Sequence, residues 1–222
     1  MISDNYLMKQ CIKSFILHVS KKMKGDVLDI GCGQKPYEDL ITGIDSVKSY
    51  TGVDIEGEYS KKCKPDILWD GNILPIDSRQ YDTLVCFEVI EHVRDISNIL
   101  KESHRVLRNS GTIIITSPFV WPLHDEPDDY FRYTPFSIDE IMNECNFTNI
   151  HTYRIGSWKS VIYQLHKLFL YRSSLSITDK LLLKPLLMFV DSYLRCRNIE
   201  KEIEIGNIEP MYLSLGVIAN KS

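Results

Sequence analysis

The 222-residue sequence predicts an α/β fold with a mainly parallel, seven-stranded sheet and helices on both faces. Short apolar segments alternate with segments of helical periodicity along most of the chain, which is the pattern of repeated βαβ units. A glycine turn directly follows the first strand segment. Hydrophobic residues make up 44% of the chain and charged residues 25%, enough for one core, so we expect a single domain over residues 1–222.

The predicted strands are bounded by polar or turn-forming residues. They lie at 27–30, 50–55, 67–69, 83–87, 112–116, 148–154 and 211–219. The residues between them predict helices at 4–22, 36–44, 96–107, 137–145, 158–171 and 180–196. In the first helix, apolar residues recur every four positions from Leu7 to Val19. Pro36 suits a first helical turn, Ser137 with Glu140 predicts a capping box, and Pro185 is expected to bend or break the last helix.

Composition excludes several classes of protein. The net charge of -4 and pI near 5.9 argue against a dedicated nucleic-acid binder. No run of 18 apolar residues predicts a transmembrane helix, and the N-terminus lacks the order of a signal peptide. The six cysteines form no CxxC pair, which predicts reduced thiols rather than a disulfide framework or a zinc site. We therefore expect a cytoplasmic protein.

The first candidate site is the glycine turn after the first strand. Gly31 and Gly33 allow the backbone to approach a ligand closely, and Asp54 at the end of the next strand can accept hydrogen bonds from ribose hydroxyls. Pro36 stands where a dinucleotide fingerprint would have its third glycine, and Asp29 places a negative charge near any bound phosphate. A ligand without phosphates and with a positive centre, such as S-adenosylmethionine (SAM), is therefore favoured over a nicotinamide dinucleotide.

Four motifs in order over residues 25–120 resemble those of class I SAM-dependent methyltransferases. VLDIGCG at 27–33 resembles their first motif, GVDI at 52–55 their second, and DGNI at 70–73 the adenine loop. FEVIEHV at 87–93 is similar to the signature of the ubiquinone-methyltransferase-like (type 11) subgroup. The resemblance implies a Rossmann-like fold, SAM as cofactor, and cofactor-binding roles for Asp29, Gly31, Cys32, Gly33, Tyr37, Asp54, Ile55, Asp70, Gly71, Asn72, Ile73, Phe87 and Glu88.

One position departs from the family pattern. Many members have a small residue where this chain has Lys35, and QKPY at 34–37 instead resembles a variant found in methyltransferases of polysaccharide clusters. In that variant Tyr37 covers the methionine end of the cofactor. Glu88 is expected to contact the amino group of the cofactor or the acceptor.

The acceptor side is expected in residues 124–136, where four acids, a histidine, an arginine and four aromatics fall together. This segment resembles methyltransferases encoded with glycosyltransferases for surface polysaccharides, which implies that Asp125, Tyr130, Arg132 and Tyr133 bind a sugar. Two alternatives stay open. Asp129, Arg132 and Tyr133 could instead form an internal lattice that shapes the loop, and Tyr130 and Phe131 could belong to the core.

Two histidines follow strand ends on the acceptor side and are the candidate catalytic bases. His92 and His124 could each take the proton of an acceptor hydroxyl, since the reference pKa of an imidazole is about 6.5. The alternative is a structural role for either one. We expect no metal, because Pro127 interrupts the spacing of His124, Asp125, Asp128 and Asp129 and the resembled subgroup is generally metal-independent.

The C-terminal part differs from the rest in charge. Residues 1–150 carry 16 Lys and Arg against 24 Asp and Glu, whereas residues 151–222 carry 10 against 6. Residues 156–200 predict a helical insertion or cap before the last strand. Its apolar helices, at 158–196, predict either core or homodimer packing, or peripheral contact with an anionic membrane.

The predicted function is SAM-dependent O-methylation of a sugar or other surface-glycan precursor. A quinone-like or other small acceptor, a SAM-binding protein without catalysis, and an NAD-dependent reductase are the alternatives that the sequence leaves open.

Overall fold

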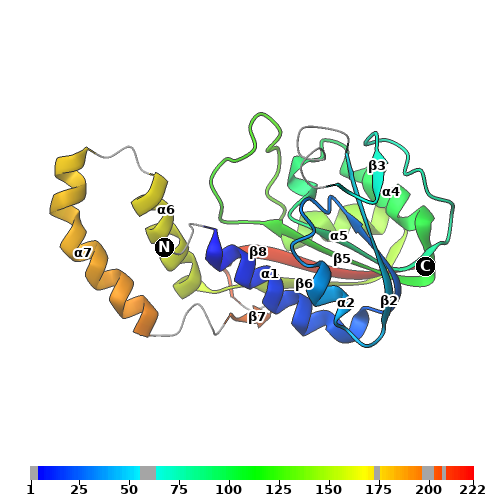
Figure 1. Cartoon of the computed structure of the whole chain (residues 1–222), viewed down its shortest axis with the longest axis horizontal. Coiled ribbons are helices and arrows are strands. Elements are labelled where there is room, and N and C mark those ends of the chain that lie inside the picture. Colours follow the sequence, from blue (N-terminus) through cyan, green and yellow to red (C-terminus); the bar gives the residue numbers. More distant parts are fainter. Residues whose placement is uncertain (1–4, 56–63, 173–175, 197–202, 207–208) are drawn as a thin grey trace.

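A computed structural model describes residues 5–55, 64–172, 176–196, 203–206 and 209–222 (Figure 1). The strands are β1 (Gly25–Ile30), β2 (Val47–Ile55), β3 (Ile67–Trp69), β4 (Tyr81–Phe87), β5 (Leu107–Pro118), β6 (Phe147–Ile155), β7 (Ile205–Gly206) and β8 (Ser214–Lys221). The helices are α1 (Tyr6–Val19), α2 (Glu38–Thr42), α4 (Ile96–Val106), α5 (Pro135–Glu144), α6 (Trp158–Arg172) and α7 (Ile177–Cys196), with short 3₁₀ turns η1 (Ser20–Lys22) and η2 (Ile90–His92).

The strands form one sheet in the order β3-β2-β1-β4-β5-β8-β6-β7. The five strands from β3 to β5 are parallel, while β8 runs antiparallel to β5 and β6. The predicted mainly parallel α/β fold is thus confirmed, with the two-residue β7 as an eighth strand. From β1 the chain first adds strands on one side and then, from β4, on the other. The carboxyl ends of β1 and β4 therefore mark the crevice where such sheets bind ligands.

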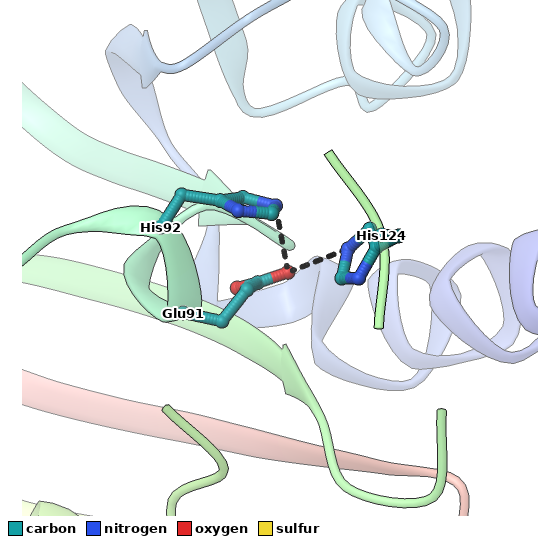
Figure 2. A group of neighbouring side chains, drawn as sticks. All are labelled: Glu91, His92 and His124. Carbon is teal, nitrogen blue, oxygen red and sulfur yellow. Dashed lines mark ion pairs between the residues drawn. The ribbon is translucent and has the colours of Figure 1, made fainter. Parts of the chain in front are cut away.

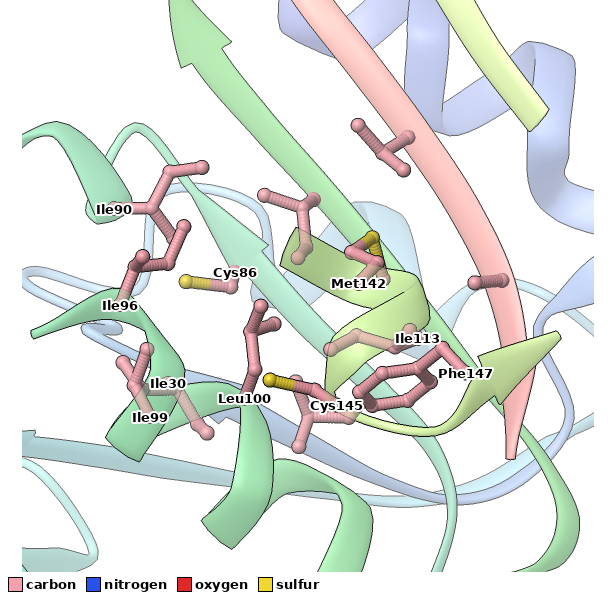
Figure 3. Close-up of a cluster of buried hydrophobic side chains, with 14 of the residues drawn as sticks. Ile30, Cys86, Ile90, Ile96, Ile99, Leu100, Ile113, Met142, Cys145 and Phe147 are labelled. Atoms are coloured by element: carbon pink, nitrogen blue, oxygen red, sulfur yellow. The ribbon is translucent and has the colours of Figure 1, made fainter. Parts of the chain in front are cut away.

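The hydrophobic core lies on both faces of the sheet. Successive residues of a strand point to opposite faces, so Leu28 and Ile30 join one cluster while Val27 joins the other. The first cluster packs under α4 and α5 and includes Leu100 and Met142 (Figure 3). The second packs under α1, α2 and α6. The sheet is therefore covered on both sides, and its carboxyl edge is left to loops.

Helix α1 packs against β8 as its periodicity predicts. Leu7, Cys11, Phe15 and Val19 are all buried. A Cβ at Gly216 would lie 2.5 Å from the Phe15 ring, so the helix approaches the strand more closely than a larger residue would allow.

Several predicted boundaries were wrong for local reasons. The capping box joins Thr134 to Ser137, not Ser137 to Glu140, because Pro135 occupies the first helical position. Helix α2 begins only at Glu38. The last strand begins at Ser214, since the preceding apolar residues are buried in a loop instead; Leu213 N–H, for example, donates to Ile155 O.

The two helices of the predicted insertion lie between β6 and the last strand, and they differ in burial. Helix α6 buries Val161, Tyr163 and Leu168, so core packing holds there. Helix α7 continues through Pro185 without the expected break. Its exposed apolar side chains include Ile177, Leu181, Leu182, Met188, Phe189 and Tyr193. In the described residues, no helix has the length and apolar character needed to cross a bilayer. Contact of residues 158–196 with a second copy or with lipid stays a prediction.

Candidate active site

The turn after β1 is shaped by close contact with the segment after β4. Gly31 has a φ of +70°, and a Cβ at this position would lie 2.4 Å from Val89 Cγ2. The N–H groups of Gly31 and Cys32 both donate to Val53 O, at 2.8 and 3.2 Å. Only glycine fits this conformation and this contact, so the turn and the residues after β4 form one continuous surface.

Asp54 ties the same turn to the end of β2. Its Oδ2 accepts a hydrogen bond from Gly33 N–H at 2.8 Å, and its Oδ1 accepts one from Ile55 N–H at 2.8 Å. A carboxylate offers about four acceptor sites, so each oxygen keeps capacity for a further hydroxyl. A Cβ at Gly33 would meet no atom within 4 Å, so the turn borders open space. The arrangement fits a ribose diol held between the turn and the strand end.

Asp29 and Tyr50 form a buried pair behind the turn. The Tyr50 hydroxyl donates to Asp29 Oδ2, and burial raises the pKa of Asp29 to about 7. Asp29 therefore carries only part of a negative charge near neutral pH. This weakens the argument against phosphates that we drew from its charge. Nearby, Tyr37 packs edge-on against Phe87 with ring centroids 5.6 Å apart, and both rings are buried.

Lys35, at which the sequence departs from the resembled motif, has its side chain along β2. Its Nζ lies 2.7 Å from both carboxylate oxygens of Asp66, and Asp66 Oδ2 in turn accepts from Gly52 N–H. The absence of a side chain at Gly52 makes room for it, since a Cβ there would lie 2.9 Å from Lys35 Cε. The departure from the family pattern is thus accommodated outside the turn.

The predicted adenine loop follows β3. Asp70 Oδ1 accepts hydrogen bonds from the N–H groups of Asn72 and Ile73, and these bonds lower the pKa of Asp70. Gly71 has a φ of +86°, which completes the turn. The side chains of Ile55 and Ile73 are exposed. They offer apolar surface of the kind that a flat base packs against.

Glu88 opens the segment after β4 with a positive φ of 55°. Its Oε1 accepts a hydrogen bond from Ser214 Oγ at 2.9 Å, and burial raises its pKa to about 7. Glu88 is therefore anchored to β8 at the edge of the crevice. Its expected contact with cofactor or acceptor stays a prediction.

The two predicted catalytic histidines lie together, with a buried glutamate between them (Figure 2). Glu91 Oε1 lies 3.7 Å from His92 Nε2 and 4.0 Å from His124 Nε2. The imidazole rings meet edge-on, with centroids 4.8 Å apart. Burial raises the pKa of Glu91 well above its ordinary value. Sequence reasoning missed Glu91 as a site residue, although the ExxEH spacing of residues 88–92 contained the signal.

The loop after β5 holds both histidines by their other ring nitrogen. His92 Nδ1 lies 2.8 Å from Asp128 O, and His124 Nδ1 lies 3.0 Å from Asp129 Oδ2. Asp129 also forms a bidentate ion pair with Arg132, at 2.6 and 2.8 Å. Arg132 holds the pKa of Asp129 well below its usual range. This pair accounts for two of the three residues in the internal lattice that we considered as an alternative.

The remaining acceptor-side residues are placed differently. The Tyr133 hydroxyl donates to Ile90 O at 3.5 Å and takes no part in the Asp129 pair. Tyr130 stacks under the Arg94 guanidinium, 4.7 Å from the ring centroid. Asp125 is exposed. Substrate binding by Asp125, Tyr130, Arg132 and Tyr133 stays a prediction.

This combination of fold and crevice is that of a SAM-dependent methyltransferase, and comparison with known proteins shows the same. Residues 5–152 match the family described as a methyltransferase domain, and the chain belongs to that family. SAM is its cofactor, and the glycine turn with Asp54 fits it. The nicotinamide-dependent alternative is thereby set aside.

Sequence relatives include the ubiquinone biosynthesis O-methyltransferase of Pelagibacter ubique, 30% identical over 125 residues that cover 52% of each chain. The enzyme of the same name from Coxiella burnetii is 25% identical over 101 residues, covering 41% of this chain and 42% of that enzyme. The matches therefore span about half the length, or less, of these curated relatives.

Solved structures agree on the fold. A SAM-dependent methyltransferase from Archaeoglobus fulgidus has a TM-score of 0.60 at 18% identity, covering 96% of this chain and 94% of the other. Phosphoethanolamine N-methyltransferase 2 of Haemonchus contortus, solved in complex with S-adenosyl-L-methionine, has a TM-score of 0.56 at 15% identity, covering 95% and 52%.

Proposed function

We propose that this methyltransferase transfers the methyl group to a hydroxyl oxygen, and that the acceptor is a sugar of a surface-glycan precursor. Oxygen as the acceptor atom is supported by the positions of Glu91, His92 and His124, which lie close together beyond the ends of β4 and β5. A hydroxyl group is barely ionised at neutral pH and must lose its proton during methyl transfer. An active site for a hydroxyl acceptor therefore needs groups that accept or transfer that proton.

In this proposal, the two sides of the crevice bind different reactants. The bound cofactor supplies an electrophilic methyl group on a sulfonium centre. The turn at Gly31–Gly33 and the Asp54 carboxylate orient it from the β1 and β2 side. The segment after β4 lies against Gly31 through Val89 and also carries Glu91 and His92. Such positioning of the two reactants contributes much of the rate, roughly 7–11 kcal/mol in well-oriented systems.

A sugar acceptor is supported by the loop after β5. This loop exposes the ring of Phe131 and the carboxylate of Asp125, which suit stacking on a sugar face and accepting its hydroxyls. Its sequence at 124–136 resembles methyltransferases encoded with glycosyltransferases. The second candidate is a phenolic hydroxyl of a quinone-like acceptor, which the relative from Pelagibacter ubique favours.

The two acceptors are separated by a direct transfer assay. The purified protein is incubated with methyl-labelled SAM and either nucleotide sugars and lipid-linked glycans or catechols and quinols. We expect label on the sugars as a base-stable methyl ether. Label on the phenols alone would replace the sugar with the quinone-like acceptor. Label on amines alone would contradict transfer to oxygen altogether.

Binding of S-adenosylhomocysteine, followed by calorimetry, is the control for these assays. Binding must be present in the wild type and lost in Asp54→Ala, whose carboxylate holds the turn. A sample that passes this control and labels no acceptor in either panel would overturn the proposed acceptors and leave the cofactor assignment standing.

A further inference from the structure

The carboxylate of Glu91 lacks the partners that a buried charge requires. Its side chain is fully buried, and neither oxygen accepts a hydrogen bond from another residue in the part of the chain that the structure describes. Burying an unpaired carboxylate costs several kcal/mol, and proteins normally offset this with a hydrogen bond, an ion pair or a metal. The imidazole Nε2 atoms of His92 and His124 face it, at 3.7 and 4.0 Å.

Both imidazoles are oriented with Nε2 toward Glu91. His92 Nδ1 lies against a backbone carbonyl, that of Asp128, which can only accept a hydrogen bond. His124 Nδ1 lies against the Asp129 carboxylate, which also accepts from Arg132 through both oxygens. Each Nδ1 thus faces a hydrogen-bond acceptor, which leaves Nε2 as the ring atom that can ligate a cation beside the glutamate.

The two Nε2 atoms and the Glu91 carboxylate thus converge on one point. A cation bound there would satisfy all three at once. The ligand atoms of Glu91, His92 and His124 all lie within 4.8 Å of one another. Two ligands of one cation, each bonded at about 2.0–2.2 Å, lie about 3–3.6 Å apart, so a small rotation of each side chain closes the site.

We propose that Glu91, His92 and His124 bind one divalent cation of the zinc, manganese and iron class. Two imidazoles and one carboxylate are ligands that these metals accept, and three protein ligands leave coordination positions open. Mg²⁺ is less suited, because it prefers an all-oxygen shell. The proposal departs from our sequence expectation of no metal, which weighed only His124, Asp125, Asp128 and Asp129 as ligands and followed the general metal-independence of the resembled subgroup. Asp129 is not a ligand but orients one, as carboxylates behind metal-bound histidines do.

The role of this cation rests on the proposed function. The acceptor hydroxyl occupies an open coordination position, and its proton is released to solvent as its acidity rises. The oxygen then forms a bond to the methyl carbon while the sulfur–methyl bond of SAM breaks. The products are a methyl ether, S-adenosylhomocysteine and one proton. Metal binding itself does not depend on this step.

The test is metal binding by protein that has been stripped with a chelator. Zn²⁺ is titrated by calorimetry, and Co²⁺ is followed by its visible absorption, which reports nitrogen and oxygen ligands. We expect one equivalent per chain. Glu91→Gln, His92→Ala and His124→Ala should each weaken binding at least about 10-fold. His151→Ala is the matched control, because His151 is an exposed histidine on β6 and should leave binding unchanged.

The outcomes test metal binding independently of the proposed methyl transfer. A wild type that binds S-adenosylhomocysteine but neither metal would overturn the proposal, and so would His124→Ala and Glu91→Gln proteins that bind metal as the wild type does. Stoichiometric metal binding, lost in these variants, would support the site even if no hydroxyl acceptor is methylated. If a variant no longer binds S-adenosylhomocysteine, the test uses His124→Gln instead, because glutamine keeps the polarity of the half-buried position of His124.

Discussion

The two sides of the crevice are built in different ways. On the cofactor side, the site is built mainly from backbone groups. Gly31 and Gly33 form the turn, and the Asp54 carboxylate accepts a hydrogen bond from the Gly33 N–H. On the acceptor side, side chains from two separate segments meet, since Glu91 and His92 lie on η2 and His124 lies in the loop after β5. The first arrangement is local and leaves a contiguous sequence motif. The second depends on how two loops pack together.

The largest expected effect is on the acceptor side. His124→Ala removes a group that we propose to act on the acceptor hydroxyl, so turnover should fall roughly 10²–10⁴-fold. The affinity for S-adenosylhomocysteine should stay the same, because the turn at Gly31–Gly33 does not depend on this residue. Initial rates and calorimetry on one preparation measure both. Equal losses of turnover and cofactor affinity would break the comparison, and His151→Ala serves as the matched histidine control.

The second prediction tests the backbone on the cofactor side. Gly31→Ala forces a side chain into a left-handed conformation and places its Cβ 2.4 Å from Val89. We expect cofactor affinity to fall about 100-fold, since the strain and the overlap each cost on the order of 1–2 kcal/mol. Gly206→Ala, where a Cβ would meet nothing within 4 Å, is the control. Unchanged affinity in a folded Gly31→Ala protein would contradict the backbone account.

The third prediction concerns the residue behind His124. Asp129→Asn removes the charge that orients the imidazole, and metal affinity should fall about 10–100-fold. Asp128→Asn is a close control, because His92 is held by the backbone oxygen of Asp128 and not by its carboxylate. Titration of Co²⁺ into both proteins makes the measurement. Equal metal affinity in the two variants would show that Asp129 does not position His124.

The fourth prediction uses the raised pKa of Asp29. The carboxyl of Asp29 has an ordinary pKa of 3.8 in the unfolded chain and a pKa of about 7 in the folded one, so the folded state holds its proton more tightly. The stability that this group contributes at low pH is therefore lost as pH rises from about 4 to about 7, by roughly 2–4 kcal/mol. Urea denaturation of the cofactor-free protein at pH 5 and pH 8 should show the loss, and Asp29→Asn should reduce it. If the stability of Asp29→Asn depends on pH in the same way as that of the wild type, the prediction is wrong.

The smallest expected effect is at the exposed end of the acceptor loop. Asp125→Asn keeps a residue that tolerates the observed φ of +49°. Because any contact with the acceptor would be solvent-exposed, KM for the acceptor should rise less than about 10-fold while kcat stays near the wild-type value. Steady-state kinetics decide this, and a loss in kcat would move Asp125 into the group with the histidines.

Much of the fold could be predicted from the sequence because its signals are local. The apolar residues at every fourth position of α1 and the short apolar strands β1 to β5 predicted the parallel sheet. The turn at Gly31–Gly33 predicted the cofactor crevice. The errors lie where apolar character has two causes. Residues 211–213 are apolar because a loop is buried there, and the sequence pattern cannot distinguish that from a strand.

The sequence by itself determined the class of fold and the cofactor, because glycine turns, strand-end acids and hydrophobic periodicity act between residues close along the chain. Only the tertiary structure decided that Glu91 and His92 meet His124, and that Lys35 lies against Asp66. These contacts connect segments that follow different strands. Their geometry depends on how neighbouring strands end at the same edge of the sheet, which no local pattern encodes.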